Sequence, residues 1–272
     1  MDNYTTSDTS AWAPDEEFRY RMETQGFCVF ENVIPPDMLA ALREAMDNAF
    51  DSDKRDLEDG RFRSDSYTAD VSRLLLGRDP VFTKLIDESP LQENIDELLG
   101  DTCIINNYSG VRLMPGIKNV VTNIHRDSPR FSPYYKLAIQ ILYFIDDFTT
   151  ETGGTWLLPG SHRSNEKPPE KVFFEGGRQI TGSAGSAMIF DSMLWHAGGK
   201  NISSLPRRGI AIVYTRSFIK QQIDIVRALP TDVFAGFSEK VKRLSGYNVR
   251  VPASLSDFYL PEDERMYKAN QG

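Results

Sequence analysis

The sequence contains three histidines, and two of them stand where they could share a metal ion with a carboxylate. His125 and Asp127 are separated by one residue, and residues i and i+2 of an extended strand point to the same side. His196 ends a later segment that is rich in strand-forming residues. Two imidazoles and one carboxylate leave open positions on a divalent metal, which is the ligand set of non-haem Fe(II) oxygenases.

The same three ligands would also hold Zn²⁺, so a zinc-dependent hydrolase is an alternative. The chain lacks the HExxH motif of the zinc metalloproteases, which counts against that alternative. A binding protein without catalytic activity is a third hypothesis. The remaining histidine, His162, follows the turn sequence Pro159-Gly160-Ser161, and we expect it to have a structural role.

The composition excludes several classes of protein. A chain of 272 residues with 40% hydrophobic residues can bury one sizeable core. We therefore expect a single domain over residues 16–272, preceded by a mobile tail at residues 1–15. The net charge is −8 and no basic stripe is visible, so nucleic acid is not an expected partner. We expect a small-molecule substrate and a monomer or homodimer.

The sequence gives no signal for export or for membrane insertion. Its first residues are polar and acidic, unlike a signal peptide. The longest apolar run, residues 137–145, contains a glutamine and is too short to span a bilayer. Cys28 and Cys103 form neither a disulfide framework nor a CxxC metal motif. A cytoplasmic protein without a membrane partner is therefore expected.

Short strand-like runs separated by glycine and proline turns dominate the middle of the chain. The expected strands are 104–114, 119–125, 136–145, 155–158, 186–190 and 209–216. No helical pattern of useful length interrupts residues 103–216. The pattern predicts a mainly-β fold, an antiparallel barrel or double-sheet jelly roll, with flanking α-helices on both sides.

The flanking regions are expected to contain the helices. Residues 26–30 predict a strand, and Pro36 opens a helix with apolar residues at three- and four-residue steps. A second helix is expected at residues 90–99, with Ser89 as its N-cap and Gln92 as its capping-box partner. A third helix is expected at 231–245. The heavily charged residues 51–80 predict a lid or a solvated loop.

Taken together, these segments resemble the phytanoyl-CoA dioxygenase family of Fe(II)/2-oxoglutarate-dependent oxygenases. The resemblance extends over residues 18–250. The segments that carry it are the His-x-Asp pair at 125–127, residues 145–162 with Gly-Gly-Thr-Trp and Pro-Gly-Ser-His, residues 185–196 ending in Trp-His, and residues 201–208.

The resemblance implies a double-stranded β-helix that holds one Fe(II) through His125, Asp127 and His196. It further implies that 2-oxoglutarate chelates the iron by its keto oxygen and C1 carboxylate and that O2 takes the remaining position. Arg207 matches the residue that holds the C5 carboxylate, for which a guanidinium fork is suited. Arg208 is the adjacent alternative, and because strand residues alternate in direction, only one of the two can face the site.

Two further residues match family positions near the co-substrate. Thr122 precedes the metal pair, and Gln140 lies within an apolar strand, where a buried amide usually has a polar task. The sequence also departs from the family at two positions. Leu142 stands where the family often has Trp, and Gly198 stands where it often has Ser, so we expect an altered pocket.

The substrate is the least constrained part of the prediction. Cations and aromatic side chains near the metal pair suit a polar or anionic ring substrate, although a solvated loop would have the same composition. The candidates for substrate contact are Arg112, Arg126, Arg130, Phe131 and Tyr135. We expect an intermediate of natural-product synthesis as the substrate; an acyl-CoA or an amino-acid derivative is the alternative within the same family.

Overall fold

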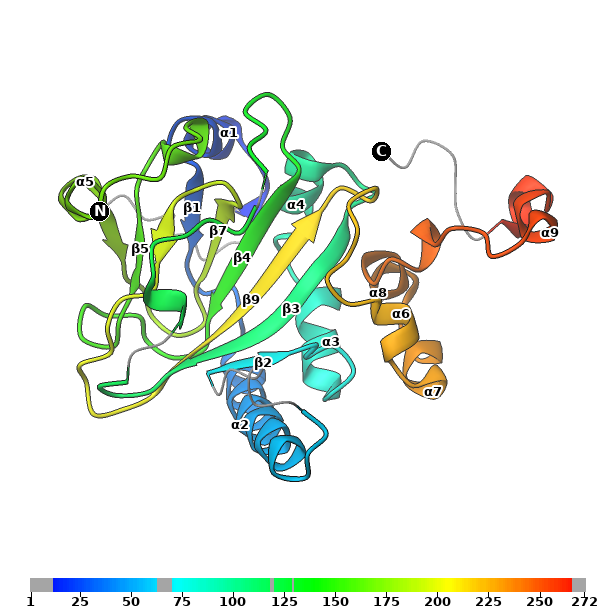
Figure 1. Ribbon diagram of the computed structural model, residues 1–272, viewed down its shortest axis with the longest axis horizontal. Coiled ribbons are helices and arrows are strands. Elements are labelled where there is room, and N and C mark those ends of the chain that lie inside the picture. The colour runs from blue at the N-terminus through cyan, green and yellow to red at the C-terminus, as the bar shows by residue number, and fades with distance from the viewer. Residues whose placement is uncertain (1–11, 63–69, 118–119, 129, 266–272) are drawn as a thin grey trace.

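The computed structural model describes residues 12–62, 70–117, 120–128 and 130–265. Its centre is formed by two antiparallel sheets, and helices surround them (Figure 1). The larger sheet has the strand order β1-β7-β4-β9-β3-β2, and the smaller sheet has the order β6-β5-β8. The strands are β1 Phe27–Phe30, β2 Val71–Arg73, β3 Ile104–Leu113, β4 Ala138–Phe144, β5 Thr155–Leu157, β6 Arg178–Ile180, β7 Ala187–Asp191, β8 His196–Ala197 and β9 Arg207–Thr215.

The two faces of the larger sheet carry different residues. On β9, Ile210, Ile212 and Tyr214 are fully buried in the main apolar core. The alternate residues Arg207 and Ala211 line a cavity on the opposite face. Because successive side chains point to opposite sides of a strand, β9 contributes to the core and to the cavity at once.

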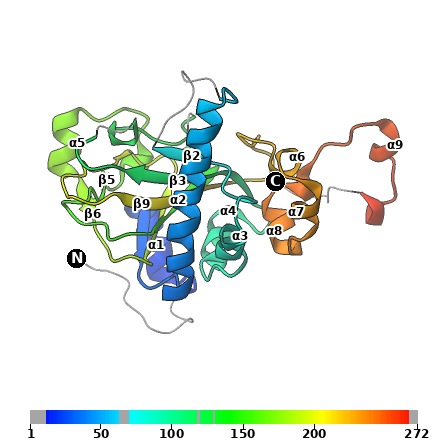
Figure 2. The same cartoon turned by 90° about the horizontal axis from the view of Figure 1, so that it is seen from below.

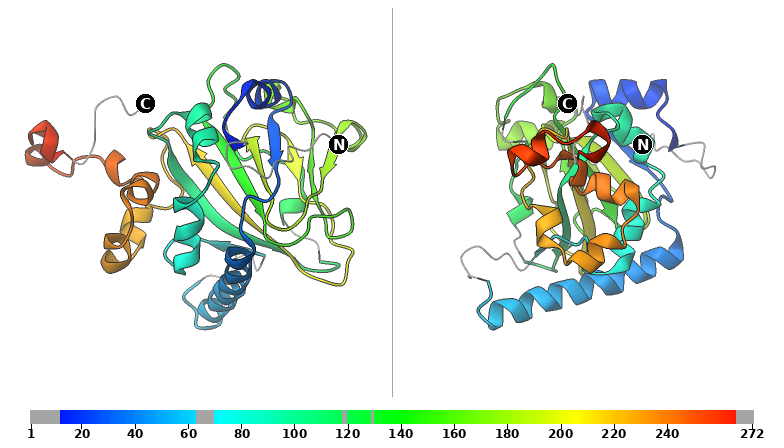
Figure 3. Two further views of the ribbon diagram at one scale, coloured as in Figure 1. Left: turned by 180° about the vertical axis from the view of Figure 1, so that it is seen from behind. Right: turned by 90° about the vertical axis from the view of Figure 1, so that its right-hand side faces the viewer.

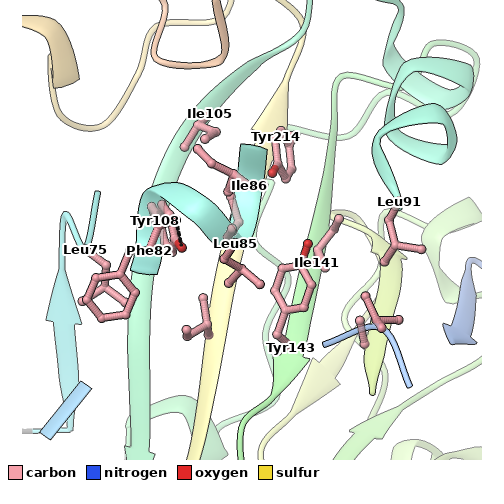
Figure 4. Close-up of a cluster of buried hydrophobic side chains, with 14 of the residues drawn as sticks. Leu75, Phe82, Leu85, Ile86, Leu91, Ile105, Tyr108, Ile141, Tyr143 and Tyr214 are labelled. Carbon is pink, nitrogen blue, oxygen red and sulfur yellow. Dashed lines mark hydrogen bonds between the residues drawn. The ribbon is translucent and has the colours of Figure 1, made fainter. Parts of the chain in front are cut away.

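The main core lies between the larger sheet and the helices α3 (Pro80–Asp87) and α4 (Gln92–Leu99). Figure 4 shows Phe82 and Leu85 of α3 near aromatic and aliphatic side chains of β3, β4 and β9. The Tyr108 hydroxyl donates to the Phe82 carbonyl at 2.9 Å, and the Tyr143 hydroxyl bonds Ser89 Oγ at 3.0 Å. Burial raises the pKa of Tyr143 to about 12, so this phenol stays neutral.

Helix α1 (Glu16–Thr24) precedes β1, and helix α2 (Pro36–Glu58) lies between β1 and β2. The lid or loop expected at residues 51–80 is wrong for the described part of that segment, because α2 continues to Glu58 and is followed by β2 and α3. Its charges are partly paired: buried Asp53 accepts a hydrogen bond from Arg78 at 2.6 Å. Residues 63–69 lie outside the described residues.

The smaller sheet packs on the cavity side of the larger one. Leu157 of β5 shares a second apolar cluster with Phe144, Met188 and Phe190 from the larger sheet. Helix α5 (Glu170–Gly176) follows β5, and its Phe173 packs with Trp195 in a third cluster. The expectation of a middle region without a useful helix is therefore wrong, because α5 interrupts it.

The described part of the strand expected at residues 119–125, which begins at residue 120, is not a strand. Val120–Thr122 form a 3-10 turn, and His125 makes a single β-bridge with His196. Two β-branched valines gave a strand-like pattern to a segment that has no long strand beside it.

The expected start of α4 is also wrong. The helix begins at Gln92 rather than at residue 90. The Ser89 hydroxyl bonds Tyr143 and accepts from the Leu91 N–H at 3.3 Å, while Gln92 Nε2 donates to Asp96. Ser89 therefore bonds a buried tyrosine of β4, which is a contact that the local sequence pattern does not reveal.

The C-terminal segment lies at one end of the molecule, with α9 farthest from the sheets (Figures 2 and 3). Its helices are α6 Ile225–Ala228, α7 Thr231–Ala235, α8 Glu239–Leu244 and α9 Leu255–Phe258. The single helix expected at 231–245 is wrong: α7 stops at Gly236, and Ser238 caps α8 by accepting from the Val241 N–H at 3.2 Å.

The fold is a mixture of helices and antiparallel strands rather than mainly β, because α2 and the C-terminal helices add much helix outside the strand-rich middle. Residues 1–11 of the expected tail lie outside the described residues; beyond them, Trp12 is buried and Asp15 caps α1. Within the described ranges, no helix is both long and apolar enough to cross a membrane.

Candidate metal centre

His125 and His196 are held side by side by their own backbones. The His125 N–H donates to the His196 carbonyl and the His196 N–H donates to the His125 carbonyl, each at 2.9 Å. This reciprocal pair brings the ring centroids to 4.2 Å. His196 is also packed edge-on against Phe190 of β7, with centroids 4.9 Å apart. The two imidazoles are therefore positioned before any ligand binds.

Asp127 lies between the two imidazoles. Its Oδ1 is 3.8 Å from His125 Nε2 and its Oδ2 is 3.8 Å from His196 Nε2. One ligand atom from each of the three residues falls within 4.8 Å of the other two. Asp127 Oδ2 is buried and has no hydrogen-bond partner among the described residues. A buried carboxylate oxygen without a partner is costly, and a bound cation would remove that cost.

The orientation of both imidazoles suits a metal. His125 Nδ1 is 2.7 Å from the Asn123 carbonyl and His196 Nδ1 is 2.9 Å from the Leu194 carbonyl. A carbonyl can only accept, so each Nδ1 is the donor and each Nε2 is the ring atom that faces Asp127. Burial lowers the pKa of His196, which keeps this fully buried imidazole neutral.

The turn at residues 191–195 connects the segment that carries Asp127 with the segment that carries His196. Asp191 ends β7, forms a buried ion pair with Lys136, and accepts from the Met193 N–H at 2.9 Å. Within the same turn, the Ser192 carbonyl accepts from the Ser128 N–H at 2.9 Å. The segment after Asp127 is thereby tied to the turn that leads into His196.

Arg207 is a buried cation that points into the cavity. Its side chain is 3% exposed, and its guanidinium carbon lies 3.9 Å from the centre of the Phe148 ring. Nε has no hydrogen-bond partner among the described residues. Burial lowers the pKa of Arg207 to about 9, against the opposing attraction of Asp146. An anionic ligand would supply the charge partner that this guanidinium lacks.

Arg208 occupies the other face of β9. Its guanidinium bonds both carboxylate oxygens of Asp47 on α2, at 2.9 and 2.8 Å, and one oxygen of Asp146 at 2.9 Å. These carboxylates raise the pKa of Arg208. The alternation of the strand therefore presents Arg207 to the cavity and assigns Arg208 to the contact between α2 and the sheet.

A cavity of about 290 Å³ contains the metal group and Arg207. Gln140 and Leu142 of β4 line it, as does Gly198. Thr122 does not line this cavity; it lies on the wall of a neighbouring hollow, and Val121 faces the metal side instead.

The residues expected to meet the substrate do not line the cavity. Arg126 bonds Asn165 at 3.0 Å and lies over Trp195, with Phe131 at the edge of the same group. Arg130 is exposed. The remaining two are engaged elsewhere: Tyr135 stacks with Phe218 and Arg216, and Arg112 lies over Phe50 and beside Asp47.

The sequence pattern did not reveal a polar wall on β3 and β2. Asn107 and Ser109 of β3 line the cavity together with Arg73 of β2. The register of β3 against β9 shifts between Ile105 and Asn107, which indicates a β-bulge at Asn106. Because of this extra residue, Ile105 faces the core while Asn107 faces the cavity. Strict alternation would place both on one face, so pattern reading could not find this wall.

His162 lies away from the metal group. It is buried, and its Nε2 is 3.1 Å from the Glu23 carbonyl. Its ring packs on Gly26, whose φ of +85° and lack of a Cβ both accommodate it: an added Cβ would lie 2.5 Å from His162 Nδ1. The residue joins the turn after β5 to the connection between α1 and β1.

Comparison with known proteins identifies the family. The model of the phytanoyl-CoA dioxygenase (PhyH) family matches residues 22–209. This chain belongs to that family. An uncharacterised protein of Mycobacterium tuberculosis is 34% identical over 253 residues, which covers 91% of this chain and 92% of the relative.

Solved structures of low sequence identity share the fold of this PhyH-family chain. EctD from S. alaskensis, solved with bound Fe, gives a TM-score of 0.63 at 22% identity and covers 80% of this chain and 83% of its own. HygX from Streptomyces hygroscopicus, solved with nickel and 2-oxoglutarate, gives 0.59 at 14% identity and covers 81% and 94%. A second EctD structure, with 2-oxoglutarate and 5-hydroxyectoine, gives 0.61 at 22% identity and covers 78% and 79%.

Proposed function

We propose that this chain is an Fe(II)- and 2-oxoglutarate-dependent dioxygenase that oxidises a small molecule, and that its two sheets are the double-stranded β-helix of such enzymes. One observation carries the proposal. The three ligand atoms of His125, Asp127 and His196 lie within 4.8 Å of one another on the wall of a cavity that also contains the unpaired cation of Arg207. A metal group alone would suit many enzymes, whereas a metal group with a buried arginine suits a dicarboxylate co-substrate.

The three ligands would hold iron through His125 Nε2, His196 Nε2 and a carboxylate oxygen of Asp127. When bound, the iron would activate O2, the four-electron oxidant; 2-oxoglutarate would supply two of the electrons on conversion to succinate and CO2, and an unactivated C–H bond of the substrate the other two. The protein contributes ligand orientation, because the Asn123 and Leu194 carbonyls fix both imidazoles with Nε2 towards the metal position.

Arg207 would bind the C5 carboxylate of 2-oxoglutarate. Its guanidinium is stacked on Phe148, so it is already oriented when the co-substrate arrives. The cavity is apolar at Phe190 and Leu142, so little water competes with the carboxylate for the hydrogen bonds of the arginine. Gln140 offers an amide on the same wall, positioned to orient either ligand.

The substrate is proposed to be a small molecule, such as an intermediate of natural-product synthesis. The cavity of about 290 Å³ is at the lower end of the usual size of small-molecule sites. The EctD structure, solved with 2-oxoglutarate and 5-hydroxyectoine, supports a small-molecule substrate.

The experiment is anaerobic reconstitution with Fe(II) and 2-oxoglutarate, followed by O2. We expect a metal-to-ligand charge-transfer absorption from the chelate before O2 and slow succinate formation after it. Asp127→Asn should abolish the succinate. Asp51→Asn is the matched control, because it makes the same change at an exposed aspartate of α2 outside the cavity, and it should behave like the wild type.

Two results would contradict the proposal. One is the absence of both the absorption band and succinate from fully metallated protein. The other is tight Zn²⁺ binding with hydrolytic activity and no response to Fe(II) and 2-oxoglutarate, which would establish the zinc hydrolase instead.

A further inference from the structure

Arg73 is a second cation on the cavity wall, far along the sheet from Arg207. It ends β2, directly opposite Ser109 of β3, and cross-strand partners project from the same face of a sheet. Both residues line the cavity. Among the described residues, the Arg73 side chain has neither a hydrogen bond nor an ion pair, and it is exposed. It is therefore available to a ligand.

The neighbours of Arg73 add hydrogen-bonding capacity. Ser109 is 3% exposed, and its hydroxyl donates to Asn107 Oδ1 at 2.9 Å. This bond occupies the amide oxygen, so the amide nitrogen of Asn107 remains as a donor on the cavity wall. A guanidinium beside an amide donor favours oxygen acceptors that carry negative charge.

The other charges of the proposed site balance one another, so the charge of Arg73 is in excess. The positive charges of Fe(II) and Arg207 are balanced by the carboxylate of Asp127 and the two carboxylates of 2-oxoglutarate. No further acid lines the cavity within the described residues, so the charge of Arg73 has no counterpart. The net charge of the chain is −8, so acidic side chains that could pair with a surface arginine are abundant outside this cavity.

We infer that Arg73 and Asn107, whose amide is oriented by the Ser109 hydroxyl, bind an anionic oxygen group of the primary substrate, a carboxylate or a phosphate. This inference rests on the proposed function and adds the class of substrate to it. β2 is four strands away from β7, which carries the Phe190 contact of His196. The anionic group would therefore be held away from the carbon that is oxidised.

The test uses protein loaded with Fe(II) and saturating 2-oxoglutarate under anaerobic conditions. Saturation keeps the position at Arg207 occupied, and the charge-transfer absorption verifies that the iron chelate has formed. The probes are hexanoate, hexyl phosphate and the neutral hexan-1-ol. Binding is titrated by the broadening of probe NMR signals by the paramagnetic iron. Absence of the absorption band would refute the proposed function, which is a separate outcome from any result with the probes.

The wild type should bind at least one anionic probe about tenfold or more tightly than the alcohol, in line with a charge-assisted hydrogen bond. Arg73→Gln should remove this preference, and Arg73→Lys should restore part of it. Arg55→Gln, at an exposed arginine of α2 outside the cavity, is the matched control and should bind like the wild type. The stronger of the two anions identifies the group as carboxylate or phosphate.

The inference is overturned if Arg73→Gln retains the preference for anions. It is equally overturned if the wild type binds the alcohol as well as the anions, or if none of the probes binds to protein that shows the charge-transfer band. The Michaelis constant for 2-oxoglutarate should be unchanged in Arg73→Gln; a large increase would place Arg73 at the co-substrate instead of the substrate.

Discussion

The two faces of the larger sheet are built from the same strands and have opposite requirements. The face under α3 and α4 is a packed core of neutral side chains, in which the Tyr108 hydroxyl has a partner and the Tyr214 hydroxyl has none among the described residues. The opposite face leaves Asp127 Oδ2 and Arg207 Nε buried without partners within the described residues. The core face therefore buries neutral groups, whereas the cavity face buries a carboxylate oxygen and a guanidinium nitrogen whose charges call for ligands. This difference in buried charge points to the cavity face independently of any motif.

The largest expected effect on stability belongs to the core face. Ile212 of β9 is fully buried, so Ile212→Ala should lower the free energy of unfolding by about 2–5 kcal/mol. The kinetic constants of the remaining folded protein should be unchanged. Urea unfolding and succinate assays on the same preparation measure both quantities.

The adjacent residue provides the matched control for that experiment. Ala211 lines the cavity opposite Leu142, so Ala211→Leu should fill space needed by ligands and lower turnover with a much smaller loss of stability. If the two neighbouring substitutions had the same profile, the separation between the faces would be wrong.

The sequence predicted the core face better than the cavity face. The strands around Ile212 and Ile141 follow from alternating apolar residues, and the candidate metal ligands follow from residue type and spacing. Alternation also implied that Arg207 and Arg208 face opposite sides. It could not reveal Arg73 or Asn107, because the β-bulge at residue 106 shifts the alternation and β2 emerges from a charged segment without periodicity.

The next effect is on the binding of 2-oxoglutarate, and it is expected at Arg207, the buried cation of the cavity face. Arg207→Gln should raise the Michaelis constant for 2-oxoglutarate roughly 10- to 100-fold, the range expected for a lost charge-assisted pair. The stability of the ligand-free protein should not fall, because the substitution removes a buried charge that has no ion-pair partner within 4 Å in the described chain. Thermal unfolding without and with 2-oxoglutarate tests both statements. A destabilised ligand-free variant would show that Arg207 is a structural cation.

A smaller effect on the Michaelis constant for 2-oxoglutarate is expected at Gly209, which lies beside the Phe148 ring under the Arg207 guanidinium. A Cβ at Gly209 would lie 3.1 Å from Phe148 Cζ and 3.2 Å from Leu142 Cδ1. Gly209→Ala should therefore displace the ring under the guanidinium and raise the Michaelis constant for 2-oxoglutarate a few-fold, with the metal affinity unchanged. An equal change in metal affinity would mean that the whole cavity wall moves, and that Phe148 does not act on Arg207 alone.

The smallest expected effect is on the pH dependence of stability. It distinguishes two buried histidines, His196 in the cavity and His162 outside it. Burial lowers the pKa of His162 from its ordinary value of 6.5, so the folded protein keeps this ring neutral while the unfolded chain protonates it. Stability is then fully present above pH 6.5 and declines as the pH falls below it, because the unfolded state binds more protons. His162→Gln removes that titration while His196 keeps its own. We expect the variant to lose less stability than the wild type between pH 7.5 and about 5.5, measured by urea unfolding of metal-free protein. Parallel pH profiles for the two proteins would show that His162 is not the group that opposes protonation, and would assign the acid sensitivity to the cavity face.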